Sequence, residues 1–159
     1  MTEKNESIED FFKTVDIFSD LDDRALQELG NLFFENKFEV GEMIFEEGSI
    51  GDAMMVIFSG EVRVSQTVGP ETEEALVVLK KGDFFGEMAV LEDLPRSATT
   101  IAHKESVILE ISRDYFMKFI ETDNKSGIKI LIKLAKIVSA RLREADKKLQ
   151  AFTDLTKWI

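Results

Sequence analysis

Apolar residues recur at helical spacing near the start of the chain. One group predicts a short helix that runs to Val15 from an N-cap at Ser7. A second group predicts a helix from about Asp22 to Phe33, capped by Ser19 or Asp20. Residues 1–34 are therefore expected to form N-terminal helices. Their apolar positions are Ile8, Phe11, Phe12, Val15, Leu26, Leu29 and Phe33.

The pattern changes from helical spacing to short strands at Glu35. Residues 35–111 contain brief β-branched or apolar segments, and glycines such as Gly48 and Gly60 stand between them. Many short strands at close spacing are typical of an antiparallel barrel or sandwich. The segments that we expect to be strands are 37–40, 43–46, 53–58, 61–68, 74–79, 97–101 and 107–111.

Helical spacing returns for the last part of the chain, residues 112–159. Ser112 is a good N-cap for a helix to Glu121, and the polar residues 122–124 interrupt the pattern. A long helix is then expected over about 126–152. The predicted fold class is α+β, mainly β: an antiparallel β-roll or jelly-roll barrel with N-terminal helices and a long C-terminal helix.

The long helix carries apolar residues in alternating steps of three and four. Such a seam is typical of helices that pair, so we expect a homodimer through this helix. The alternative is that the seam folds back on its own barrel. A second apolar row is confined to the first half of the helix and comprises Ile130, Leu134 and Ile137. The seam comprises Ile128, Leu131, Ala135, Val138, Leu142, Ala145, Leu149 and Phe152.

Length and composition narrow the class of protein. The 159 residues suit one domain with an extension, and the absence of cysteine excludes a disulfide framework and a thiolate metal site. No apolar stretch is long enough for a membrane span, and no secretory leader is visible at the N-terminus. We therefore expect a cytoplasmic protein without a membrane partner.

Charge is distributed unevenly along the chain. Residues 1–124 hold 28 acidic and 11 basic side chains, whereas residues 125–159 hold 3 acidic and 9 basic ones. A basic end can bind nucleic acid, but lysines on a solvated helix can equally offset an acidic body. We favour the second interpretation and do not expect direct DNA binding.

The segment from Phe84 to Thr100 combines groups suited to a phosphate and a sugar. Gly86 lets the backbone approach a ligand, and a helical turn over residues 87–91 would point its free N–H groups at an anion. Arg96 offers a planar guanidinium for phosphate oxygens, and Glu87 offers acceptors for a sugar hydroxyl. The alternative is that Arg96 only forms a surface pair with Glu87, Glu92 or Asp93.

This segment resembles the phosphate-binding cassette of the cyclic-nucleotide-binding domain family, in which residues 84–100 would be the cassette. The family includes catabolite activator proteins and the regulatory subunits of cyclic-nucleotide-dependent kinases. The resemblance implies that Glu87 holds the ribose 2′-hydroxyl. It also implies that Arg96, Ser97 and backbone groups hold the cyclic phosphate. The expected ligand-binding residues are Phe85, Gly86, Glu87, Met88, Ala89, Arg96, Ser97 and Ala98.

The resemblance also implies a mechanism. A cyclic nucleotide would bind in the barrel, and the C-terminal helices would relay binding to a downstream protein. Ser97 resembles bacterial cAMP receptors, so we favour cAMP; the alternative is cGMP, because a hydroxyl at this position can also serve the guanine amino group. Ile128, Leu131 and Ile132 are candidates to cover the base. Only nine residues follow Gln150, too few for the helix-turn-helix module that activators of this family carry, so no output domain of that kind is expected.

No catalytic arrangement is visible in the sequence. There is one histidine, His103, so a histidine-rich metal site is excluded, and no nucleophile and base can be paired. We predict a protein that is not an enzyme and that has no metal. The alternative function is a scaffold that keeps the fold but binds no nucleotide.

Overall fold

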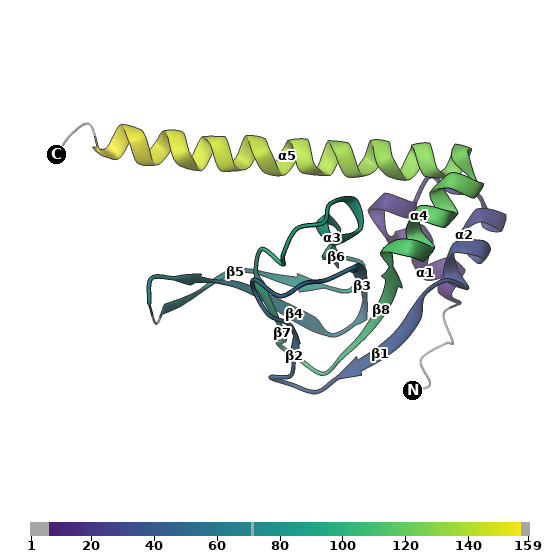
Figure 1. The fold of residues 1–159 in the computed structure, drawn as a ribbon, viewed down its shortest axis with the longest axis horizontal. Helices are drawn as coiled ribbons and strands as arrows, with labels where there is room; N and C mark the ends of the chain where they lie inside the picture. The colour runs from purple at the N-terminus through teal and green to yellow at the C-terminus, as the bar shows by residue number, and fades with distance from the viewer. Residues whose placement is uncertain (1–6, 71, 157–159) are drawn as a thin grey trace.

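The computed structural model describes residues 7–70 and 72–156. The helical elements are α1 (Ile8–Thr14), η1 (Asp16–Phe18), α2 (Asp23–Gly30), α3 (Met88–Leu91), α4 (Arg113–Thr122) and α5 (Asn124–Thr156). Two antiparallel sheets form a roll, and the helices α1, α2 and α4 gather at one end of it (Figure 1). The short helix α3 lies between the roll and one long helix, which runs across the roll and beyond (Figure 1). None of the described helices is both long and apolar enough to cross a membrane.

Each sheet of the roll has four strands among the described residues. The orders are β1-β8-β3-β6 and β2-β7-β4-β5, so strands distant in sequence lie side by side, as the predicted β-roll requires. The strands are β1 (Phe34–Phe38), β2 (Met43–Phe45), β3 (Ala53–Ser59), β4 (Glu61–Val68), β5 (Thr72–Lys80), β6 (Phe84–Phe85), β7 (Thr99–Ala102) and β8 (Ser106–Ser112).

Strand β3 is buried on both faces, which explains its uninterrupted apolar sequence. Alternate side chains of a strand point to opposite faces of its sheet. Met55 and Ile57 pack inside the roll with residues of both sheets. Met54 and Val56 point the other way, into a larger core beneath the helices. The helical residues of that core include Phe11, Phe12, Leu26, Leu29, Phe116, Ile130 and Leu134.

Several local expectations need correction at the helix ends. The predicted caps at Ser7 and Ser112 are confirmed, because each side chain accepts a hydrogen bond from the first turn of its helix. For α2 the cap is Asp22 instead of Ser19 or Asp20, since its carboxylate accepts from the amide of Ala25 at 2.9 Å. The helix also ends at Gly30, three residues before the predicted end.

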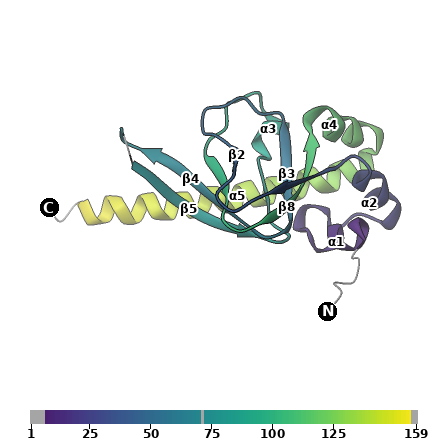
Figure 2. The ribbon, with the colours of Figure 1, turned by 90° about the horizontal axis from the view of Figure 1, so that it is seen from below.

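Helix α5 has 33 residues, about 50 Å at 1.5 Å per residue, and begins and ends beyond the predicted 126–152. Ile130 and Leu134 are buried against the core, and Ile137 is partly buried there. The seam residues are exposed instead; Leu142, for example, is 61% exposed. The last turns of α5 point away from α1, α2 and α4 and extend past the β4–β5 hairpin (Figures 1 and 2).

Candidate functional site

The segment 84–100 begins as strand β6 at the edge of the β1-β8-β3-β6 sheet and continues as a compact loop. Phe84 and Phe85 pair with Val56 and Met55 of β3, and the chain then turns at Gly86, whose φ is +73°. Only glycine adopts that φ readily, and a Cβ there would also lie 2.7 Å from Nη1 of Arg96. The expected helical turn is present as α3.

An arginine of α4 holds this loop in place. Nε of Arg113 donates to the carbonyl oxygen of Ala89 at 2.8 Å, and Nη2 donates to the carbonyl oxygen of Glu92 at 2.7 Å. Nη1 pairs with the Asp93 carboxylate at 2.7 Å. The end of α3 and the chain that follows it are therefore anchored to the first residue of α4.

Arg96 is buried, with 8% of its surface exposed. Its Nη2 donates to the carbonyl oxygen of Ala53 at 3.0 Å, and its guanidinium carbon lies 4.1 Å above the ring centre of Phe45. Burial lowers the pKa of this guanidinium, and the nearby charge of Asp52 acts in the opposite direction. The Nε atom is buried without a hydrogen-bond partner.

No carboxylate among the described residues forms an ion pair with Arg96. Two of the three proposed surface partners pair with other residues, because Asp93 binds Arg113 and Glu87 binds Arg141. The Glu92 carboxylate, also among the described residues, forms no ion pair with Arg96. The alternative interpretation of Arg96 as half of a surface ion pair is therefore wrong. A buried cation whose hydrogen bonds go to neutral carbonyls is suited to an anionic ligand.

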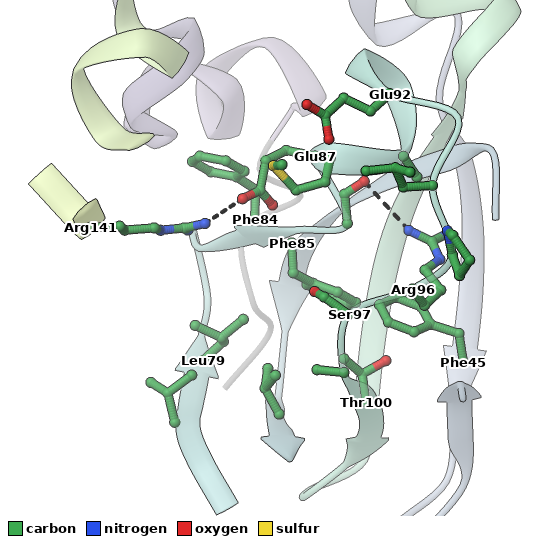
Figure 3. A pocket seen from close by; sticks show the side chains of 18 residues that line it. Phe45, Leu79, Phe84, Phe85, Glu87, Glu92, Arg96, Ser97, Thr100 and Arg141 are labelled. Atoms are coloured by element: carbon green, nitrogen blue, oxygen red, sulfur yellow. Dashed lines mark hydrogen bonds and ion pairs between the residues drawn. The ribbon is translucent and has the colours of Figure 1, made fainter. Parts of the chain in front are cut away.

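Glu87 is also buried, with 5% of its surface exposed, and it pairs with a residue of the long helix. Nη1 of Arg141 donates to Oε1 of Glu87. The Arg141 guanidinium also lies 5.9 Å from the ring centre of Phe84. Figure 3 shows Arg141 reaching the cassette from the α5 side, across the cavity from Arg96. The Glu87 carboxylate and the Arg96 guanidinium thus stand at separate ends of one pocket (Figure 3).

The pocket between these charges has a volume of about 480 Å³, within the usual range for small-molecule sites. All eight predicted ligand-binding residues line it. One wall is formed by four residues that lie next to one another on the neighbouring strands β2, β7, β4 and β5. They are Phe45, Thr100, Val64 and Val77. Within this apolar wall, the Thr100 hydroxyl is buried and has no hydrogen-bond partner.

The three residues predicted to cover the base do not line the pocket. Ile128, Leu131 and Ile132 are 58%, 40% and 50% exposed. Their role as a lid stays a prediction. The pocket residue that α5 supplies is Arg141, more than two turns further along the helix.

Sequence reasoning missed Arg141 as a site residue, although a signal was present. Ile130, Leu134 and Ile137 form the buried row of α5, and the next position in the same three-and-four spacing is Arg141. An arginine that continues this row is placed on the side of α5 that faces the roll, where it can meet a carboxylate. Phe45 and Thr100 carry no comparable signal, because their place in the pocket depends on strand pairing.

Comparison with known proteins identifies the family. A model of the cyclic nucleotide-binding domain matches residues 35–123, more than half of the chain. The chain belongs to the cyclic nucleotide-binding domain family. Among the described residues, no group of three or more acidic or histidine side chains could hold a metal ion.

Individual relatives include a cGMP-dependent protein kinase and a regulatory subunit of a cAMP-dependent protein kinase. The chain is 35% identical over 120 residues to the cGMP-dependent protein kinase egl-4 of Caenorhabditis briggsae, an alignment that covers 74% of this chain and 16% of the kinase. It is 35% identical over 111 residues to the cAMP-dependent protein kinase regulatory subunit of Yarrowia lipolytica, which covers 69% of this chain and 28% of that protein.

A solved structure of similar fold is the Thermus thermophilus catabolite activator protein. The TM-score is 0.79 at 28% identity, over 86% of this chain and 62% of that one. The chain spans less than a third of either kinase-related protein, so the activities of those whole proteins do not transfer to it.

Proposed function

We propose that this chain is a sensor that binds cAMP, in preference to cGMP, and relays binding through its C-terminal helices. The observation that carries the proposal is Arg96, a buried guanidinium at a nucleotide-sized pocket with no carboxylate partner among the described residues. The cyclic phosphate would supply the missing anion. The choice of cAMP rests on Ser97, which follows the pattern of bacterial cAMP receptors and lines the pocket.

The ligand would lie across the pocket from Arg96 to Glu87. Its phosphate would accept hydrogen bonds from Arg96 and Ser97, and its ribose hydroxyl would donate to Glu87. Its base would pack on the apolar wall that includes Val64 and Val77. The Ala89 amide already donates to the Gly86 carbonyl oxygen at 3.1 Å. This amide is used within the turn, so it is not among the donors proposed for the phosphate.

The relay would pass through α5, because this helix both touches the pocket and carries an exposed apolar seam. A ligand shifts such an element only by binding one arrangement more tightly than another. We propose that the seam pairs with a second copy of the chain, as expected from its heptad spacing, and that the pair acts on a downstream protein.

The test is a calorimetric titration of cAMP and cGMP into protein that has been unfolded and refolded to remove bound ligand. We expect micromolar or tighter binding, with cAMP the tighter ligand. Arg96→Leu should lose about 2–5 kcal/mol of binding free energy, because the phosphate loses its buried charged partner.

Arg63→Leu is the matched control, since Arg63 lies on β4, which pairs with the strand β7 that follows the cassette, and does not line the pocket. It should bind like the wild type. A folded wild type that binds neither nucleotide would contradict the proposal and favour the scaffold interpretation. Tighter binding of cGMP would contradict the choice of cAMP.

A further inference from the structure

We propose that Gln66 of β4 is a positioning residue for Ser97. The side-chain nitrogen Nε2 of Gln66 donates to the carbonyl oxygen of Ser97 at 2.8 Å. This inference rests on the proposed function, in which the Ser97 hydroxyl binds the cyclic phosphate. It adds a residue that lies outside the cassette and does not line the pocket, yet sets how strongly the phosphate end of the pocket binds its ligand.

Packing holds Ser97 less firmly than it holds the residues on either side. Arg96 and Ala98 are buried, with 8% and 7% of their surfaces exposed, whereas Ser97 is exposed. In the part of the chain that the structure describes, the bond from Gln66 is the side-chain hydrogen bond that reaches Ser97. A residue that packing does not fix depends more on its hydrogen bonds, so this contact decides where the Ser97 hydroxyl stands.

Arg96 is held by a different part of the roll. Its backbone amide donates to the carbonyl oxygen of Ser49 at 2.8 Å, and its carbonyl oxygen accepts from the amide of Gly48 at 2.8 Å. Both partners belong to the loop between β2 and β3. That loop therefore fixes the backbone of the guanidinium residue, while the next carbonyl group along the chain, that of Ser97, is bound from β4.

The strand pairing explains why a side chain makes this contact. The ladder between β4 and β7 ends at the pair Ser65 and Thr99, so Ser97 lies beyond it. Alternate side chains of a strand share one face, and on β4 this face carries Val62 inside the roll and Val64 in the pocket wall. Gln66 is the next position on that face, where its amide takes the place of a backbone donor.

The backbone of β4 is itself fixed where Gln66 leaves it. Gln66 pairs with Glu74 of β5, and the amide of the next residue, Thr67, donates to the Glu47 carboxylate at 2.8 Å. The amide of Glu47 in turn donates to the Thr99 hydroxyl at 3.0 Å. The end of β4, the β2–β3 loop and the start of β7 are thus tied together around the Gln66 side chain.

The test is a double-mutant cycle on cAMP affinity, measured by calorimetry on refolded protein. Gln66→Met keeps the length of the side chain but removes the donor. It should weaken cAMP binding about 5-fold when Ser97 is present, the usual effect of one hydrogen bond between neutral groups. In a Ser97→Ala background the same change should have little effect, because the hydroxyl that Gln66 positions is already absent.

Two further variants make the comparison specific. Thr67→Val is the matched control, because Thr67 is adjacent on β4, its side chain is exposed, and the variant keeps the backbone amide that binds Glu47. It should bind cAMP like the wild type. Gln66→Asn shortens the side chain by one methylene, so its amide no longer reaches the Ser97 carbonyl and the loss should again depend on Ser97. Urea unfolding confirms that each variant is folded.

The outcomes separate this inference from the proposed function. A wild type that binds neither cAMP nor cGMP overturns both. A wild type that binds cAMP, together with unchanged affinity in Gln66→Met, overturns the role of Gln66 alone. An equal loss with and without the Ser97 hydroxyl also overturns it, because Gln66 would then support the fold and not Ser97.

Discussion

Space around Arg96 is decided by a glycine that lies far from it in sequence. A Cβ built on Gly51 would overlap the Nε and Cζ atoms of Arg96. The guanidinium has little room to yield, since it lies between that backbone and the ring of Phe45. Gly51 is therefore needed for close packing against a side chain.

Gly51→Ala should displace Arg96 and weaken cyclic nucleotide binding about 10-fold or more, the cost of one lost hydrogen bond to a charged group. Calorimetry with cAMP measures the effect. Ile50→Ala is the control, because Ile50 is adjacent in the chain and 93% exposed. Equal affinity in Gly51→Ala and the wild type would mean that Arg96 does not contact the ligand.

At the scale of elements, one residue separates the two C-terminal helices. The Asp123 carboxylate accepts from the amide of Ser126 at 3.1 Å and from its hydroxyl at 2.8 Å. These bonds cap the first turn of α5, and they lower the pKa of Asp123. The direction of α5, and so the position of Arg141, begins at this cap.

Asp123→Ala should lower the free energy of unfolding by about 1 kcal/mol at neutral pH, as expected for a lost N-cap. The pKa of Asp123 is lowered in the folded state, so its contribution is present at neutral pH and is lost as the pH falls through that lowered value. Urea unfolding at pH 7 and at pH 3 measures both effects. A difference between variant and wild type that grows in acid would contradict the assignment.

At the scale of the whole molecule, α5 is fixed to the helical end of the roll by its first half, and its apolar seam is exposed. Nζ of Lys133 pairs with Asp16 at 3.1 Å and with Asp20 at 3.5 Å, next to the buried row. These contacts agree with basic residues of the helix offsetting an acidic body. Beyond Arg141, the apolar seam is exposed in the single chain.

Leu142→Asp should convert the proposed dimer into a monomer, because a charge in an apolar helix seam is left buried and unpaired. Light scattering at micromolar concentration measures the mass. Ala140→Asp is the control, since Ala140 is exposed on the same helix outside the seam. A wild type that is already monomeric, or a Leu142→Asp protein that stays dimeric, would place the contact elsewhere.

Local patterns in the sequence determined much of this protein. The caps at Ser7 and Ser112, the short strands of the roll and the cassette with its turn at Gly86 were all predictable. Each depends on residues a few positions apart, where spacing and backbone preference act directly. The eight cassette residues that line the pocket were predicted from the resemblance of this segment to the family.

The tertiary structure alone decided which distant residues complete the pocket. Arg141 meets Glu87 because the buried row of α5 sets the rotation of that helix over the roll. Thr100 and Phe45 share a wall because β2 and β7 pair in this register, and Gly51 clears space for Arg96. Such contacts depend on how packed elements are placed relative to one another, which no local spacing encodes.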